Sequence, residues 1–216
     1  MLPCAATSHT CEDLGGTGSL DTACVVASSS TLSASACFHG AGTLDILPGV
    51  TIACPLPGCH LSFNVSGTIA VGSRAQLVGG SLTLHASNVS LGIGSAVNAT
   101  ALAGAPPPQT SGTPHSLEGA GGGHGGRGAS CKVSNDTNWG GDVYAWASLD
   151  SPWSYGSKGG GFSVDEQLGG DGGGRVLLRA SEILSVDGVV LAQGGVGSVR
   201  GGGGSGGSIM IQAYKL

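Results

Sequence analysis

The chain has 216 residues, of which 43 are glycine, 40% are hydrophobic, 10% are charged and 4% are aromatic, and its net charge is −5. Disordered chains combine low hydrophobicity with high net charge, collagen needs glycine at every third position, and a membrane helix needs about 20 consecutive apolar residues. The sequence has none of these patterns, and its weakly acidic balance argues against nucleic acid as a partner. We therefore expect an ordered all-β protein rich in small and β-branched residues.

Cysteines dominate the first part of the chain. Cys11 and Cys24 bracket a glycine-rich stretch, and Cys54 and Cys59 flank "PLPG", a turn compact enough to be closed by a disulfide. Each pair is a candidate disulfide that would add about 2–3 kcal/mol by restricting the unfolded chain. Zinc bound by Cys54, Cys59 and His60 is the alternative, but the spacing is loose and a fourth ligand is unassigned. We expect no metal and no other cofactor.

Short extended segments separated by glycine turns recur along the chain. The clearest copies cover 61–80, 82–104 and 176–195, and partial copies cover 43–54 and 207–216. Each has a strand of alternating apolar residues, a small polar corner and a second strand, with a period of about 20 to 23 residues. The pattern favours a parallel β-helix, or β-solenoid, in which each coil stacks its apolar residues on the coil below. A β-sandwich is the alternative, but hairpin turn signals are sparse.

These repeats divide the chain into four parts. We expect a cysteine-containing capping segment over 1–40, solenoid turns over 41–104, a Pro/Gly-rich and aromatic insertion loop over 105–170, and further solenoid turns over 171–216. In the last part, the aligned residues Leu178, Ile183 and Val186 are expected to point inward.

Glycine clusters such as "GAGGGHGGRG" precede several of the expected strands. The run over 121–126 has the spacing G-x-G-x-x-G, but it follows a proline-rich loop and no helix comes after it. The stretch "GGDGGGRVL" over 169–177 fails as a calcium-binding repeat because Asp171 is misplaced. We interpret the clusters as long turns against the solenoid wall, where glycine permits close backbone approach and positive φ. His124 and Arg127 in one cluster could bind an anion, but we favour a role in solubility.

Aromatic residues concentrate between positions 139 and 155. They are Trp139, Tyr144, Trp146, Trp153 and Tyr155. Aromatic rings offer flat apolar faces with polar edges, which makes this group a candidate carbohydrate-stacking site. We favour the alternative that the rings pack on the flank of the solenoid as a satellite core.

Loop carboxylates are the candidates for an enzyme site, because parallel β-helices often act on polysaccharides. They are Asp142, Asp150, Asp165, Glu166 and Asp171, with Arg175 or Arg179 as the base. They do not occupy equivalent positions of successive strands, so we favour solvated charges over an acid–base pair or calcium ligands. The histidines show no metal-ligand spacing and no nucleophile elbow occurs. We therefore predict no catalytic residues.

Four of the five asparagines begin Asn-X-Ser/Thr sequons. They are Asn64, Asn88, Asn98 and Asn135. Together with the seven cysteines, they indicate an N-glycosylated, disulfide-bearing protein of the secretory pathway. The start, "MLPCAATSHT", lacks the features of a signal peptide, so we expect a fragment or an incomplete gene model. The odd cysteine fits a chain whose partner cysteine is lost.

Several long stretches resemble the plant glycine-rich proteins of uncharacterised function. They are "CEDLGGTGSLDTAC" (11–24), "ILPGVTIACPLPGC" (46–59), "PPPQTSGTPHSLEGAGGGHGGRGA" (106–129), "WGGDVYAW" (139–146), "SYGSKGG" (154–160) and "GGGGSGGSIMIQAYKL" (201–216). The resemblance implies that the chain is the N-terminal ectodomain part of a longer protein with a signal peptide and, near its C-terminus, membrane-spanning helices. That family supplies no established activity or catalytic residue. The chain departs from its pattern at Cys4 and Cys37, so neither is assigned to a disulfide.

These features predict a non-enzymatic, extracellular structural or adhesive β-solenoid of a plant membrane or cell-wall-associated protein. The expected partners are cell-wall polysaccharide or other surface proteins, with membrane contact only through segments outside this chain. A pectin-lyase-like enzyme and a carbohydrate-binding module are the alternatives. A solenoid cut at Leu216 would expose an unpaired edge, so we expect the isolated chain to aggregate.

Overall fold

The computed structural model describes residues 9–133, 135–144, 151–162 and 168–216. Within these ranges the protein is all-β, as predicted, and its helical elements are short 3₁₀ turns, among them η1 (Glu12–Leu14) and η2 (Pro108–Thr110). The chain forms two compact units. Unit 1 comprises Met1–Asn98, Val176–Leu191 and Met210–Leu216, and unit 2 comprises Ala99–Arg175 and Ala192–Ile209. In the described part of the chain, no helix is long and apolar enough to cross a membrane.

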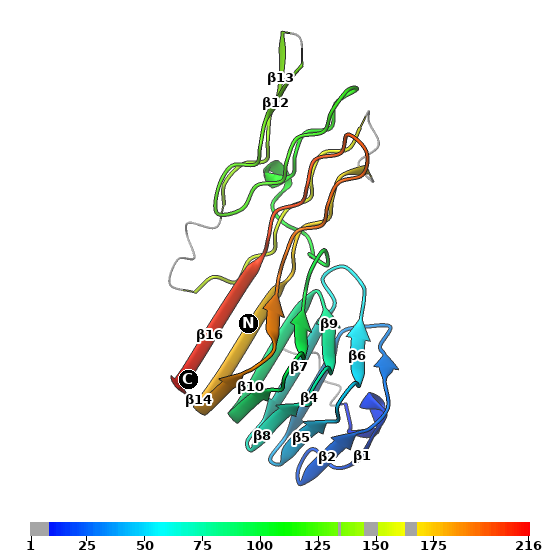
Figure 1. Ribbon diagram of the computed structural model, residues 1–216, viewed down its shortest axis with the longest axis vertical. Coiled ribbons are helices and arrows are strands. Elements are labelled where there is room, and N and C mark those ends of the chain that lie inside the picture. The colour runs from blue at the N-terminus through cyan, green and yellow to red at the C-terminus, as the bar shows by residue number, and fades with distance from the viewer. Residues whose placement is uncertain (1–8, 134, 145–150, 163–167) are drawn as a thin grey trace. The chain divides into compact units, whose positions relative to one another are not determined.

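The repeats form two sheets (Figure 1). The larger sheet contains β1 (Gly16–Gly18), β2 (Ala23–Val26), β4 (Ala36–Gly40), β5 (Thr43–Ile46), β7 (His60–Val65), β8 (Thr68–Val71), β10 (Ser81–Leu91), β14 (Arg175–Val186) and β16 (Ser208–Lys215). The smaller sheet has the order β15 (Val189–Leu191), β11 (Ala96–Asn98), β9 (Gln76–Gly79), β6 (Thr51–Cys54) and β3 (Ser30–Thr31). β1 and β2 pair antiparallel, whereas β2–β5, β5–β8, β8–β10, β4–β7, β7–β10 and the pairs of the smaller sheet are parallel.

The parallel registers align each repeat with the preceding one. One aligned column contains Val26, Ile46, Val71 and Leu91, in steps of 20, 25 and 20 residues. The longer step arises between β6 and β7, where the loop from Pro55 to Cys59 is inserted, whereas Gly80 alone separates β9 from β10. The spacing therefore slightly exceeds the predicted period in the repeat that contains this loop.

Most of unit 2 is inserted between two successive strands of the smaller sheet. β11 ends at Asn98, and the strand that pairs with it next is β15, which begins at Val189. The hydrogen bond from Val189 N–H to the carbonyl of Ser95 (2.9 Å) repeats the bond from Ala96 N–H to the carbonyl of Ala75 (2.9 Å). The chain thus resumes the same parallel pairing after a long insertion.

Apolar side chains from successive repeats form the core of unit 1. Phe38 and Phe63 share one register, are fully buried, and stack with their ring centroids 5.2 Å apart. Leu84 continues this column on β10. Burial of each such side chain contributes about 1.5–3 kcal/mol. No single repeat can shield these residues, so the core forms only when repeats stack.

One part of the inward prediction for β14 is wrong. Leu178 is fully buried, as expected, but Ile183 and Val186 are 46% and 39% exposed. Leu178 and the buried Leu184 are an even number of residues apart, so they share one face of the strand and Ile183 lies on the other face. Val186 has the inward register but lies at the end of β14, where the next strand, β15, also begins with an exposed residue, Val189.

Extended glycine segments in unit 2 hydrogen-bond to one another through their backbones, with a spacing of three residues. The N–H groups of Gly156 and Gly159 donate to the carbonyls of Gly173 and Gly170, respectively. Those of Gly202 and Ser205 donate to the carbonyls of Gly160 and Ser157. Those of Gly204 and Gly207 donate to the carbonyls of Gly195 and Ala192. Gly119 and Gly122 likewise donate to Arg200 and Gly203. These segments are not β-strands. A polyproline II helix likewise repeats every three residues and has no internal hydrogen bonds. We call this array of bonded segments the glycine lattice.

Only glycine fits at many positions of the glycine lattice. A Cβ atom at Gly202 would lie 1.9 Å from the carbonyl oxygen of Ala120, and one at Gly119 would lie 1.9 Å from that of Gly160. The expected close backbone approach is therefore confirmed. The expected positive φ is wrong, because the described glycines with positive φ are Gly15, Gly18, Gly49, Gly58 and Gly94, all in unit 1. The clusters form mutually bonded extended segments, which satisfy their N–H groups without turning the chain.

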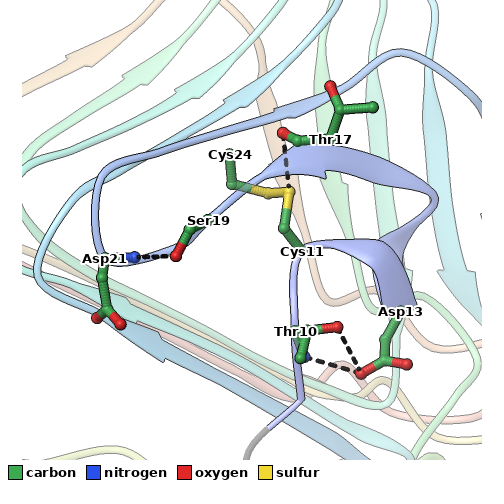
Figure 2. The surroundings of a disulfide bond; sticks show 7 residues. All are labelled: Thr10, Cys11, Asp13, Thr17, Ser19, Asp21 and Cys24. Carbon is green, nitrogen blue, oxygen red and sulfur yellow. Dashed lines mark hydrogen bonds between the residues drawn. A yellow bond between two sulfur atoms is a disulfide. The ribbon is translucent and has the colours of Figure 1, made fainter.

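Both predicted disulfides are present. Cys11–Cys24 joins the start of unit 1 to β2, beside the Thr10–Asp13 turn (Figure 2), and Cys54–Cys59 closes the loop between β6 and β7. Their Cα–Cα distances are 5.6 and 6.1 Å.

The alternative of a zinc site at Cys54, Cys59 and His60 fails, because both of its cysteines are oxidised. Cys37 is also disulfide-bonded, although no sequence pattern assigned it, whereas Cys131 is a half-buried free thiol. Cys4 lies outside the described residues.

Candidate functional site

A cleft in unit 2 is built around an exposed tryptophan. The cleft has a volume of 370 Å³, and its lining residues are Gln109, Ser111, Thr113, Arg127, Trp139, Gly140 and Asp142. Trp139 is 58% exposed, although it lies beside the buried Asn138. We call this feature the Trp139 cleft. Its accessible lining is predominantly polar, with amide, hydroxyl, guanidinium and carboxylate groups, and Trp139 is its one aromatic residue.

Backbone hydrogen bonds hold the two walls of the Trp139 cleft together. Thr113 N–H donates to the carbonyl of Trp139 (3.2 Å), and Asp142 N–H donates to that of Gln109 (3.0 Å). The side-chain amide of Asn138, which is 4% exposed, donates to the carbonyls of Thr113 (3.0 Å) and Glu118 (2.7 Å). Both protons of this buried amide group are therefore used to fix the backbone immediately before Trp139.

Two glycines separate Trp139 from Asp142 and permit this arrangement. A Cβ atom at Gly140 would lie 1.9 Å from the carbonyl oxygen of Gly128, and one at Gly141 would lie 1.7 Å from that of Thr110. The "WGGD" stretch can therefore lie directly against neighbouring backbone, with the side chains of Trp139 and Asp142 at its two ends.

An ion pair borders the tryptophan. Arg127 Nη2 donates to Asp142 Oδ1, and both side chains are about half exposed, at 56% and 52%. The guanidinium carbon of Arg127 also lies 5.8 Å from the centroid of the Trp139 ring. An exposed pair of this kind contributes little to stability, typically less than about 1 kcal/mol. Its charges cancel, so the Trp139 cleft has no excess charge from these two groups.

Two buried hydroxyl groups are connected to the cleft through Thr110, the residue between its lining residues Gln109 and Ser111. Ser157 and Thr110 are 0% and 2% exposed, and their hydroxyl oxygens are 2.6 Å apart. Thr110 donates to the carbonyl of Pro107, Tyr144 donates to that of Tyr155, and the Tyr144 hydroxyl lies 3.2 Å from that of Ser157. Burial raises the pKa of the Tyr144 phenol, which therefore stays protonated and acts as a donor.

His124 packs against the same tyrosine. Its ring centroid is 5.0 Å from that of Tyr144, and its Nε2 is 2.8 Å from the hydroxyl of Ser154. Burial lowers the pKa of His124, so the neutral imidazole is favoured. His124 and Arg127, the two residues of the candidate anion site, therefore differ in their surroundings. His124 is half-buried against Tyr144 and Ser154, whereas Arg127 lines the Trp139 cleft.

Two other aromatic residues clamp an arginine. The guanidinium carbon of Arg175 lies 4.5 Å from the ring centroid of Trp153 and 4.3 Å from that of Tyr155, and its Nη1 donates to the carbonyl of Trp153 (3.1 Å). Contacts of this type stabilise by about 0.5–2 kcal/mol. Trp153 and Tyr155 are thus engaged in packing.

The predicted aromatic group is therefore divided in the structure. Trp139 is exposed in a cleft, whereas Tyr144, Trp153 and Tyr155 are half-buried and contact other parts of unit 2. Trp146 lies outside the described residues. Gln109, Ser111 and Thr113 were not singled out from the sequence, because a proline-rich stretch gives no sign of what it faces. The glycine pair in "WGGD" was the one local signal of a close approach.

The predicted acidic candidates do not form one group among the described residues. Asp142 pairs with Arg127, Asp171 pairs with Lys158 (3.0 Å), and Arg179 donates to Gln212 (2.8 Å). Asp150, Asp165 and Glu166 lie outside the described ranges. Within those ranges, no three His, Cys, Asp or Glu side chains are placed to hold a metal ion.

The sequon asparagines lie in different surroundings. Asn64 on β7 and Asn135 between β12 (Cys131–Val133) and β13 (Asp136–Asn138) are exposed. Asn88 and Asn98 are half-buried, and the Asn88 amide donates to Glu182 (3.4 Å). The first two are the more accessible acceptors for a glycan.

Comparisons of the chain with protein-family models, with curated proteins and with solved structures found no match.

Proposed function

We propose that this chain is a non-enzymatic structural or adhesive β-solenoid from the ectodomain of a plant glycine-rich surface protein, acting outside the cytoplasm. The solenoid assignment is supported by the parallel registers, which align equivalent residues of successive repeats. It is also supported by the return of the same pairing at β15 after the insertion of unit 2. The plant family is proposed from the sequence resemblance alone.

The observation that carries the structural role is the glycine lattice. Its segments are joined by backbone hydrogen bonds at every third residue, and at many of its glycines the neighbouring backbone leaves no room for a Cβ atom. An array held by main-chain bonds between distant segments has few conformational alternatives, because each segment is bonded to more than one neighbour. Such an array suits a load-bearing or presenting surface.

The extracytoplasmic location is supported by the oxidised cysteines. Disulfides persist in oxidising compartments and are rare in the cytosol. Two exposed sequon asparagines, Asn64 and Asn135, are also accessible to the glycosylation machinery.

A polysaccharide-cleaving enzyme is the less well supported function. Glycoside hydrolysis requires two carboxyl groups on either side of one bond, at separations of about 5–9.5 Å. A pectin-lyase-like reaction requires acidic calcium ligands, and the described residues hold no group of three His, Cys, Asp or Glu side chains placed for a metal ion. Asp142 and Asp171 each form an ion pair with a different basic residue, Arg127 and Lys158. Neither carboxylate has the apolar surroundings that would create a general acid.

The proposal is tested by secreting the chain from a eukaryotic host behind a signal peptide and incubating it with isolated plant cell-wall material. We expect a glycosylated, disulfide-bonded protein that is retained by the wall material and releases no reducing sugar. Release of reducing ends by the purified protein would refute the non-enzymatic assignment. Secretion only in a misfolded, reduced form, or absence of retention, would refute the extracytoplasmic adhesive role.

A further inference from the structure

We propose that the Trp139 cleft binds a neutral pyranose residue of a polysaccharide. The inference rests on the adhesive part of the proposed function and deepens it by naming the ligand class and the residues that hold it. It requires an exposed aromatic surface, polar groups that match sugar hydroxyls, and a cleft whose shape exists before binding.

Trp139 supplies the stacking surface. The C–H groups on one face of a pyranose make an apolar patch that packs on an aromatic ring, and indole is the largest such ring. The guanidinium carbon of Arg127 lies 5.8 Å from the centroid of the Trp139 ring, and Trp139 remains 58% exposed, so part of its surface is accessible to a ligand. Trp153 is the contrasting case, because the guanidinium of Arg175 lies 4.5 Å from its ring centroid and donates to its carbonyl.

The polar lining matches the hydroxyl groups of a sugar. Hydroxyls both donate and accept, so a site for them needs both kinds of partner close to the ring. Gln109, Ser111 and Thr113 on one wall offer an amide and two hydroxyls, and Arg127 and Asp142 on the other offer a charged donor and a charged acceptor. Charged groups make the stronger hydrogen bonds to neutral partners.

Charge balance selects a neutral sugar over an acidic one. The Arg127 guanidinium is already paired with the Asp142 carboxylate, so a uronate or phosphate bound to its remaining N–H groups would lie close to that negative charge. The repulsion between the two anions would weaken binding. A neutral hydroxyl can bond to either partner without breaking the pair.

The size and rigidity of the cleft suit a short stretch of polysaccharide. Its volume of 370 Å³ lies at the lower end of the roughly 300–1,000 Å³ range of small-molecule sites, which suits one or two sugar rings. The backbone bonds Thr113–Trp139 and Asp142–Gln109 connect its walls, and the buried Asn138 amide fixes the approach to Trp139. Binding therefore requires little ordering of the protein.

The test is affinity electrophoresis of the secreted chain in gels containing xyloglucan, mixed-linkage glucan, galactomannan or polygalacturonate. We expect retardation by at least one neutral polysaccharide, a loss of affinity of at least about tenfold in Trp139→Ala, and substantial retention in Trp139→Phe. Tyr214→Ala is the matched control, because Tyr214 is an 89% exposed aromatic residue of unit 1. It should be retarded like the wild type.

Three outcomes would overturn the inference: no retardation by any neutral polysaccharide, unchanged retardation of Trp139→Ala, or retardation by polygalacturonate alone. A circular dichroism spectrum and melting curve of each variant show whether it is folded. If Trp139→Ala fails to fold, Gln109→Ala and Asp142→Asn remove polar partners of the sugar and keep the inference testable, since each must also weaken retardation.

The outcomes separate this inference from the proposed function. Wall retention that survives Trp139→Ala would leave the adhesive role intact and refute the Trp139 cleft as its site. Retardation by a neutral polysaccharide without retention by cell-wall material would support the site and refute the wall-contact role.

Discussion

The N–H of Gly202 donates to the carbonyl of Gly160, and the position where Gly202 would carry a Cβ atom lies 1.9 Å from the carbonyl oxygen of Ala120. One residue thus bonds to one neighbouring segment while lying too close to another for any side chain. This relationship recurs through the glycine lattice, and it makes the stability of unit 2 depend on which glycines are replaced.

Two glycines on either side of His124 test this dependence. A Cβ atom at Gly123 would lie 2.3 Å from the carbonyl oxygen of Gly141, whereas one at Gly125 would meet nothing within 4 Å. We expect Gly123→Ala to lower the free energy of unfolding by at least about 2 kcal/mol, because backbone must move. Gly125→Ala should stay within about 0.5 kcal/mol of wild type. Urea unfolding followed by circular dichroism measures both, and equal effects would contradict the packing seen here.

The two described disulfides should differ in their contribution to stability. Cys11–Cys24 closes a sequence separation of 13 residues and Cys54–Cys59 one of 5. The loop-entropy relation gives about 3 and about 2 kcal/mol respectively, so the double serine variant of the first pair should unfold at lower denaturant. Cys131→Ser is the control, because Cys131 is a free thiol and its loss should have little effect. The reverse order of the two pairs would indicate that native-state packing outweighs loop entropy.

Stability should fall as the pH drops below neutrality. Burial lowers the pKa of His124, and burial followed by the charge of Arg179 lowers that of His85. The unfolded chain then binds protons more readily than the folded one, so the stabilisation is complete above about pH 6.5 and is lost as the pH falls through the folded pKa. Chemical unfolding between about pH 8 and 5 should show this decline, and His124→Gln should reduce its slope. An unchanged slope in both His124→Gln and His85→Gln would contradict the assignment.

The contacts of Arg175 with Trp153 and Tyr155 should stabilise the folded protein more than a cation–aromatic contact at the surface does. The guanidinium carbon of Arg175 lies close to two ring centroids, at 4.5 and 4.3 Å, whereas that of the exposed Arg200 lies 5.5 Å from the centroid of Phe162. We expect Arg175→Met to cost about 1–3 kcal/mol, because two contacts and a hydrogen bond to Trp153 are lost. Arg200→Met should cost less than about 0.5 kcal/mol. Thermal unfolding followed by tryptophan fluorescence compares them, and similar losses would show that the contacts of Arg175 contribute no specific stability.

Local patterns in the sequence were sufficient for strands within the recognised repeats and for two disulfides. Apolar and polar residues alternate over 61–65 and 82–86 because successive side chains of a strand point to opposite faces, and the period of the alternation is a property of the strand itself. Cys54 and Cys59 are brought together by the turn between them, so their bond follows from a few residues of sequence. Even so, Ile183 was assigned to the wrong face, because alternation predicts two faces but does not say which one the neighbouring strand covers.

Contacts between distant segments decided the bonding of the glycine clusters and the surroundings of the tryptophans. The glycine clusters could be recognised from composition, but their three-residue bonding could not, since Gly202 bonds to Gly160 and Gly119 to Arg200 across long stretches of chain. Trp139 and Trp153 are the same residue type in one short segment, yet Arg175 lies over the ring of Trp153 at close range while Trp139 stays exposed beside the polar groups of Gln109, Ser111 and Thr113. The sequence by itself determined an oxidised all-β chain with regular repeats, because alternation, turns and short disulfide loops are local. Only the tertiary structure decided which glycines interlock and which tryptophan is available to a ligand, because both depend on backbone and side chains from remote parts of the chain.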